Sequence, residues 1–196
     1  MFKRLIVVAT IMMLFIGIQA ERASAELITN GGFTTGDFTG WTISGNTDMQ
    51  NGTAWYLVNS DGLSLTPAAP SAYYAQFGST GSPTFISQNI ATAAGTAYAV
   101  SFYLANDMPG TNEFKALWNG ALQTPHLVNA DAFDWTQYQF TATATGSSTP
   151  ISFGFQHETS VFNFTNVTAA PVPIPGALLL FGPGLVGIAA IRKRLS

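Results

Sequence analysis

The sequence predicts an all-β fold, an antiparallel β-sandwich, between two apolar terminal segments. Residues 26–169 contain short runs rich in β-branched and aromatic residues, separated by turn-forming residues, which is the pattern of strands and loops. No stretch of useful length has the spacing of an amphipathic helix. About nine strands at this spacing favour two packed antiparallel sheets. The candidate strands are residues 40–44, 54–59, 72–77, 84–90, 97–105, 113–120, 135–145, 150–156 and 161–169.

Turn chemistry and alternation refine this prediction. The Asn119-Gly120 dipeptide predicts a hairpin that joins residues 113–119 to residues 121–128. Because successive side chains of a strand point to opposite faces, alternation divides each strand into an inward and an outward set. The inward set is Tyr98, Val100, Phe102, Leu104, Phe114, Trp118, Tyr138, Phe140, Ile151, Phe153 and Phe155. The outward set includes Tyr103, Trp135, Gln137, Gln139, Ser152 and Gln156.

The first 25 residues have the features of a secretory signal peptide. Lys3 and Arg4 precede an apolar run from Leu5 to Ile18, and the small residues Ala23 and Ala25 mark a cleavage site. The alternative is an uncleaved signal anchor.

Residues 170–196 combine a proline motif, a short apolar segment and a basic end. The motif is Val172-Pro173-Ile174-Pro175-Gly176, and Arg192-Lys193-Arg194 stand near the terminus. Between them, residues 176–191 predict a transmembrane helix of about 24 Å at 1.5 Å per residue, which is short for a hydrocarbon core of about 30 Å. Basic residues flank the outer side of both apolar segments, so the positive-inside rule places both chain ends in the cytoplasm. The region between the two segments is therefore expected to be exported.

A nucleotide-binding reading of the same segment fails on its context. Residues 182–187, GPGLVG, match the dinucleotide fingerprint G-x-G-x-x-G. That fingerprint requires a preceding strand, a following amphipathic helix and an acidic residue about 20 positions further on. Only nine residues follow Gly187, and none is acidic. The glycines are better explained by close packing of a membrane helix.

The region between the terminal segments is acidic and free of cysteine. Residues 26–171 hold one basic residue, Lys115, and nine acidic ones, a net charge of −8. Proteins hold phosphate backbones with Lys and Arg, so nucleic acid is excluded as a partner. The lack of cysteine excludes disulfides and Cys-ligated zinc, and two histidines, His126 and His157, do not predict a metal site. A surface of Thr, Ser, Asn and Gln suits uncharged, hydroxylated partners.

No catalytic residues are predicted. A glycosidase needs two carboxylates about 5–10 Å apart, and here no two acids share one strand face, since Asp131 and Asp134 have opposite parity. The nucleophile motif G-x-S-x-G is missing. His157, at the end of a predicted strand, is interpreted as a structural or rim residue. A pair of distant carboxylates that converge in space stays as an alternative.

The outward set combines aromatic rings with amide side chains. A ring covers the apolar C–H surface of a sugar, and amides hydrogen-bond its hydroxyls. We therefore predict a carbohydrate-binding face formed by Tyr103, Trp135, Gln137, Gln139 and Gln156. The alternative is that these residues simply coat a sheet, with Trp135 at its edge.

Three stretches resemble the exported PEP-CTERM proteins of Gram-negative bacteria. They are ELITNGGFTTGDFTGWTISG (26–45), YAVSFYLANDMPGTNEFKALWNG (98–120) and WTQYQFTATATGSSTPISFGFQ (135–156). The resemblance implies a jelly-roll ectodomain similar to carbohydrate-binding modules. It also implies that the tail is a sorting signal, which holds the precursor in the inner membrane until an exosortase cuts near the proline motif. The mature protein would then join the outer surface or an exopolysaccharide-rich matrix.

The chain departs from the family pattern at three places. Val-Pro-Ile-Pro replaces the usual Pro-Glu-Pro, Thr34 replaces an acid, and Thr165-Asn166-Val167-Thr168 replaces a stretch with an acidic pair. Related modules use such acids to hold a structural Ca²⁺, an ion that prefers several oxygen ligands, usually with carboxylates among them. With Asp37 and Asn166 as the remaining candidate ligands, no cofactor is predicted, and calcium is the less favoured alternative.

These observations predict a signal peptide at residues 1–25, a jelly-roll domain at 26–169 and a sorting signal at 170–196. Signal peptidase, an exosortase and, transiently, the inner membrane are the expected partners in export. The predicted function is a non-catalytic surface or matrix protein that binds exopolysaccharide. The alternatives are a structural coat or biofilm component without a discrete ligand, and a polysaccharide hydrolase or lyase.

Overall fold

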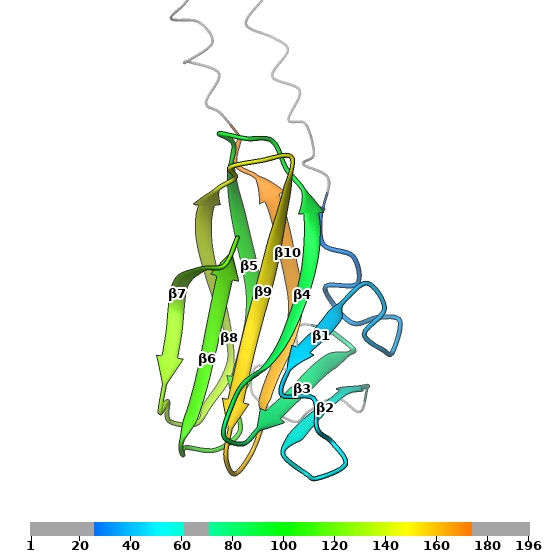
Figure 1. Ribbon diagram of the computed structural model, residues 1–196, viewed down its shortest axis with the longest axis vertical. Helices are drawn as coiled ribbons and strands as arrows, with labels where there is room; N and C mark the ends of the chain where they lie inside the picture. Colours follow the sequence, from blue (N-terminus) through cyan, green and yellow to red (C-terminus); the bar gives the residue numbers. More distant parts are fainter. Residues whose placement is uncertain (1–25, 61–70, 174–196) are drawn as a thin grey trace, which may run out of the picture. The chain divides into compact units, whose positions relative to one another are not determined.

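Two five-stranded antiparallel sheets make up the fold (Figure 1), seen here in a computed structural model that describes residues 26–60 and 71–173. The strands are β1 (Thr42–Gly45), β2 (Ala54–Asn59), β3 (Tyr74–Ser79), β4 (Thr84–Ala91), β5 (Ala97–Asn106), β6 (Asn112–Trp118), β7 (Ala121–Val128), β8 (Phe133–Thr143), β9 (Ser148–His157) and β10 (Phe162–Pro171). No helix in the described ranges is long and apolar enough to span a membrane. The predicted signal peptide, the predicted transmembrane helix and most of the sorting motif lie outside these ranges.

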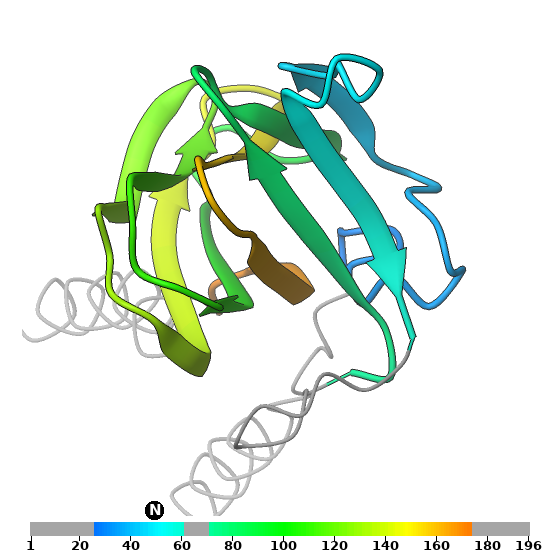
Figure 2. The same cartoon turned by 90° about the horizontal axis from the view of Figure 1, so that it is seen from below.

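The chain passes repeatedly between the two sheets, as in a jelly roll. Sheet A has the order β1-β4-β9-β6-β7, and sheet B has the order β2-β3-β10-β5-β8. Figure 2 shows the two sheets on opposite sides of a shared interior. The last strand, β10, lies inside sheet B, where it pairs with both β3 and β5. The predicted antiparallel sandwich is thus confirmed.

Phenylalanine rings fill the interior between the sheets. Fully buried rings from sheet A face fully buried rings from sheet B, and the closest pair, Phe77 and Phe155, stacks with centroids 4.2 Å apart. Each such side chain contributes roughly 1.5–3 kcal/mol through burial. The structure confirms the predicted inward set: all of its members are buried except Tyr138, which is half-buried against the core.

The predicted hairpin is also confirmed. Trp118 pairs with Ala121 across the turn. Asn119 and Gly120 have φ values of 50° and 77°, and positive φ at both central residues is what a two-residue type I′ turn requires.

Residues 26–41 run beside β10 and are fastened to it by backbone hydrogen bonds. Leu27 N donates to Ala169 O (3.1 Å), and Val167 N donates to Gly31 O (3.0 Å). Phe33 is completely buried and stacks on Trp41 with centroids 6.0 Å apart. A Cβ atom on Gly31 would lie 2.0 Å from Val167 O, so this close approach needs a glycine.

Candidate functional site

The outer face of sheet B, the side turned away from the phenylalanine core, carries most of the predicted binding residues. We refer to it as the B face. Its side chains alternate with buried core residues along each strand. They are Trp55, Leu57 and Asn59 of β2; Tyr74, Gln76 and Gly78 of β3; Asn163 and Thr165 of β10; Ser101, Tyr103 and Ala105 of β5; and Trp135, Gln137 and Gln139 of β8.

Three of the five predicted sugar-binding residues lie together on this face. Tyr103 and Gln137 are direct cross-strand partners on β5 and β8, and Gln139 pairs with Ser101 one step along. Gln137 and Gln139 are exposed, and Tyr103 is half-buried. The side chains therefore form a small surface with an aromatic ring beside two amides.

Trp135 belongs to the B face but does not offer an open ring, so this part of the prediction is wrong. Its side chain is only 4% exposed and packs edge-on against Tyr74, with centroids 5.9 Å apart. Tyr74, Ala105 and Trp135 form a second buried cluster, with Tyr103 packed against it. Alternation gives the face of a strand that a residue occupies, but not whether its neighbours cover it.

Gln156 lies on the other sheet, so the prediction that it shares a face with Tyr103 is also wrong. It sits on β9 of sheet A, opposite Glu113 of β6. Its Nε2 donates to Glu158 Oε1 at 2.8 Å. Ser152 is on the same strand, opposite Leu117.

Trp55 is the exposed aromatic residue that the sequence analysis missed on the B face. Its side chain is 54% exposed and stands opposite Gly78 of β3. Along β2, Trp55 and Leu57 have one parity and Tyr56 and Val58 have the other. Because both sets are apolar, the sequence does not say which set faces water.

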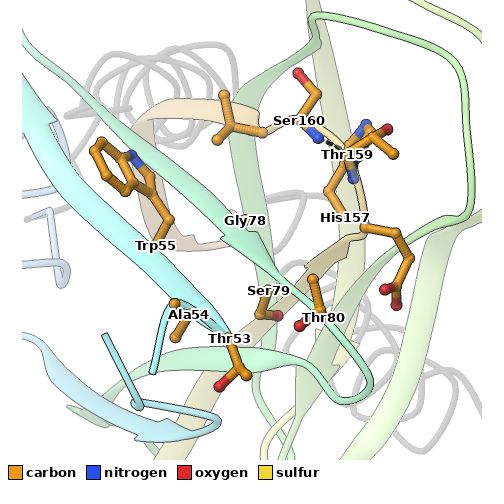
Figure 3. Close-up of a pocket in the computed structure, with 12 residues that line it drawn as sticks. Thr53, Ala54, Trp55, Gly78, Ser79, Thr80, His157, Thr159 and Ser160 are labelled. Atoms are coloured by element: carbon orange, nitrogen blue, oxygen red, sulfur yellow. Dashed lines mark hydrogen bonds between the residues drawn. The ribbon is translucent and has the colours of Figure 1, made fainter. Parts of the chain in front are cut away.

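Trp55 flanks a shallow pocket of about 250 Å³ (Figure 3). Figure 3 shows Gly78 between Trp55 and the turn that carries Thr159 and Ser160. A Cβ atom on Gly78 would lie 2.5 Å from Ser160 O, so the glycine lets the turn close against β3. The result is a flat floor beside an exposed indole ring.

His157 fixes the turn that forms this pocket wall. Its ring is 2% exposed, and both nitrogens have partners. Nδ1 accepts from Ser160 N at 3.0 Å, so Nε2 carries the proton and donates to Met108 O at 3.0 Å and toward Asn106 Oδ1 at 3.1 Å. His157 is a structural residue, as the sequence suggested.

A row of hydrogen-bonded polar side chains crosses the B face from β2 to the end of β5. Asn59 Nδ2 donates to Gln76 Oε1 (2.6 Å), and Gln76 Nε2 donates to Asn163 Oδ1 (2.9 Å). Asn163 Nδ2 in turn donates to Asp107 Oδ1. We refer to these four residues as the amide row. Asn163 is completely buried, whereas Gln76 and Asn59 are half-buried.

The N-terminal loop, where the family pattern suggested calcium, is organised around an amide nitrogen. Asn30 Nδ2 donates to Thr35 Oγ1 (2.7 Å), Asp37 O (3.0 Å) and Thr39 O (3.0 Å). The Asp37 carboxylate accepts from the Thr35 hydroxyl and from Thr39 N, and these bonds lower its pKa. Asp37 Oδ1 and the carbonyl oxygens of Asp37 and Thr39 thus already accept hydrogen bonds from N–H and O–H donors. In the described parts of the chain, no three His, Cys, Asp or Glu residues are grouped to hold a metal, and the residues at this loop do not fit calcium.

Removing divalent cations is therefore expected to leave the melting temperature unchanged, whereas Asn30→Ala lowers the free energy of unfolding by about 1 kcal/mol, because the loop loses the three hydrogen bonds that Asn30 Nδ2 donates at its exposed surface. Differential scanning calorimetry with and without a chelator measures both effects. Asn51→Ala is the matched control, because Asn51 bonds Asp48 in an exposed turn. A fall in melting temperature on chelation would contradict the amide-centred loop.

The fold resembles several solved structures, among them a carbohydrate-binding module. A carbohydrate-binding module, TmCBM61, solved in complex with β-1,4-galactotriose, aligns with a TM-score of 0.55 and 17% identity, covering 76% of this chain and all of that one. An arabinose-bound GH51 α-L-arabinofuranosidase aligns with a TM-score of 0.53 and 16% identity over 77% of this chain. The enzymatically active domain of tailspike protein 4 of bacteriophage CBA120 aligns with a TM-score of 0.51 and 14% identity over 75% of this chain.

The alignments cover 27% of the arabinofuranosidase chain and 21% of the tailspike chain, so they concern one part of each longer protein. No known protein family matches this sequence, and no curated protein matches it. At these identities the similarity is one of fold. The described region is an all-β, two-sheet antiparallel sandwich of the jelly-roll type found in carbohydrate-binding modules.

Proposed function

We propose that this chain is an exported, non-catalytic polysaccharide-binding protein and that its B face binds the glycan. The observation that carries the proposal is Trp55, an indole ring 54% exposed on the sheet and beside a pocket, whose cross-strand partner Gly78 lies two residues along β3 from Gln76 of the amide row. An exposed aromatic ring can cover the apolar C–H surface of a sugar, and its polar edge can hydrogen-bond. Tyr103, Gln137 and Gln139 extend the same face across β5 and β8.

The charge of the chain supports an uncharged glycan. Lys115 is the single basic residue of residues 26–171. It lies on sheet A, where its Nζ is 2.8 Å from Glu113 Oε2. A glycan carrying carboxylates or sulfates would meet no cation on the B face, since that face has amide, hydroxyl and aromatic groups. The shared fold with a galactotriose-binding module makes β-1,4-galactan a reasonable first test ligand.

Trp55→Ala is expected to weaken glycan binding at least tenfold, about 1.4 kcal/mol, because the ring that stacks on the sugar is lost. Isothermal titration calorimetry with β-1,4-galactan and with the exopolysaccharide of the producing cells measures the effect. Leu122→Ala is the matched control, because Leu122 is a 52% exposed apolar residue on sheet A. Equal affinity of Trp55→Ala and the unchanged protein would move the site away from the pocket.

We also propose that residues 170–196 act as a sorting signal, of which residues 174–196 lie outside the described part of the chain. The support is the order of the proline motif, the apolar segment and the basic end. Material recovered outside the cell is expected to end near Pro175. Intact mass spectrometry tests this, with a Pro173→Ala, Pro175→Ala double variant expected to accumulate uncut in the membrane fraction. Secreted protein that keeps Ser196 would refute cleavage.

A second candidate, hydrolysis of the glycan, is favoured by one arrangement. Asp107 and Asp134 line the same pocket of about 210 Å³, and a glycosidase uses two such carboxylates. Incubation of the protein with each polymer, followed by an assay for new reducing ends, decides between binding and hydrolysis. A structural coat protein would show neither saturable binding nor product, but self-association that depends on concentration.

A further inference from the structure

In the amide row, every carboxamide donates its hydrogen bond toward the same end of the row. One residue, Asp107, determines this orientation. Each carboxamide side chain presents a donor and an acceptor of nearly the same shape, so either orientation fits a given space. An ionised carboxylate, in contrast, only accepts. Asn163 must therefore turn its Nδ2 toward Asp107 and its Oδ1 toward Gln76, as the structure shows.

The same constraint passes along the row. Because Asn163 offers an oxygen, Gln76 must offer its Nε2, which leaves Gln76 Oε1 to face Asn59. Asn59 then commits its Nδ2 to Gln76, so its Oδ1 is the atom turned away from the row. The donors and acceptors at the half-buried, β2 end of the B face are thereby determined at the β5 end.

The geometry points to Asp107 as the positioning residue of the B face: its ionised carboxylate orients Gln76 and Asn59 for a glycan, and binding weakens when that carboxylate is protonated. This inference rests on the proposed function. Asn163 transmits this orientation from Asp107 to Gln76. Its side chain is completely buried and cannot hydrogen-bond to solvent instead, so its two neighbours in the row determine its orientation.

The surroundings of this carboxylate shift its pKa upward. Although the residue as a whole is exposed, partial burial of its carboxylate raises the pKa of Asp107, against the hydrogen bond from Asn163, which lowers it. Two other titratable groups face it: His157, from the end of β9, and Asp134, which shares its pocket. Both side chains are still present in a variant substituted at position 107.

The Asp107→Asn substitution keeps the shape of the side chain, but the new carboxamide can both donate and accept hydrogen bonds. The carboxamides of the amide row can then take either of two opposite orientations. If the two are equally populated, apparent affinity falls about twofold, and by more if the reversed row is preferred. We expect the unchanged protein to bind progressively more weakly as pH falls from neutral through the raised pKa of Asp107. The Asp107→Asn variant should bind more weakly at neutral pH and lack this component of the pH profile.

Stability provides a readout that moves in the opposite direction. A carboxyl group whose pKa is raised by folding contributes stability in its protonated form, and that contribution is lost as pH rises through the raised pKa. Acidification through this range thus strengthens the fold at Asp107 while it weakens glycan binding. Loss of binding at acidic pH cannot then be ascribed to unfolding at this site.

The experiment titrates β-1,4-galactan, or the polymer found to bind above, into the protein purified from its producing cells, across a pH series. The unchanged protein, Asp107→Asn and the control Asp131→Asn, which removes an exposed acid from the loop between β7 and β8, are compared, with melting temperatures at each pH. We expect Asp131→Asn to show the same dependence of glycan affinity on pH as the unchanged protein. Asp107→Asn should bind more weakly at neutral pH, and its affinity should change less with pH. Identical profiles for Asp107→Asn and the unchanged protein would overturn the role of Asp107 and leave glycan binding intact. Absence of binding by all three would instead overturn the proposed function, and the role of Asp107 with it.

Discussion

Trp135→Ala is expected to lower the free energy of unfolding by about 3–5 kcal/mol, the usual cost of truncating a buried tryptophan. The ring is 4% exposed and fills the space between Tyr74, Ala105 and Tyr103. Its removal leaves a cavity on the B face that β3 and β5 cannot close, because both are fixed by ladder hydrogen bonds to β10. Chemical denaturation monitored by fluorescence or circular dichroism measures the change.

Trp135→Phe is the informative control. A phenylalanine keeps the edge-on contact with Tyr74 and removes an indole N–H that has no hydrogen-bond partner among the described residues. An unsatisfied buried donor costs about 1–3 kcal/mol, so its loss offsets part of the lost contact area. We expect Trp135→Phe to remain close to the unchanged protein in stability. If Trp135→Ala were equally stable but failed to bind glycan, Trp135 would be a ligand-contacting residue, as the sequence alone suggested.

Gly31→Ala is expected to destabilise the domain by about 3 kcal/mol or more, at the upper end of the cost of overpacking. The new methyl group would lie 2.0 Å from Val167 O and 3.1 Å from Ile28 Cγ2. The backbone of residue 31 would have to move away from β10, which breaks the bond from Val167 N to Gly31 O and loosens Phe33 in the core. Thermal unfolding measures this effect.

Gly146→Ala is the matched substitution for this test. The nearest atom to a Cβ there is Ser148 O at 3.9 Å, so the change should stay within about 0.5 kcal/mol. Equal melting temperatures for the two variants would mean that residues 26–41 are not held against β10 as described.

The sequence predicted the fold well because the signal for each strand is local. Alternation within residues 97–105 and 150–156 identifies the buried phenylalanines without any knowledge of partners, and Asn119-Gly120 defines its own turn. The sheet to which a strand belongs is not local information. Gln156 and Gln137 have the same appearance in sequence, and strand pairing alone places them on opposite sheets.

The candidate site was predicted only in part, for three physical reasons. Trp135 has an outward parity, but cross-strand neighbours bury it. Trp55 alternates with other apolar residues, so parity is ambiguous there. The contact between Gln76 and Asn163 joins residues 87 positions apart, and it exists because β10 inserts beside β3. None of these features follows from a local pattern.

The position of β10 also sets the order in which the domain acquires its structure during synthesis. β10 ends at Pro171 and supplies the middle of sheet B, pairing Phe162 with both Phe77 and Asn106. Until that last strand has emerged, β3 and β5 have no strand between them to pair with. The large sequence separation between each of them and β10 makes this pairing slow. The domain therefore completes its folding only when almost its entire length is available, just before the proline-rich stretch that begins at Val172. Under the proposed export, the chain would remain unfolded enough to pass a translocation channel until that point.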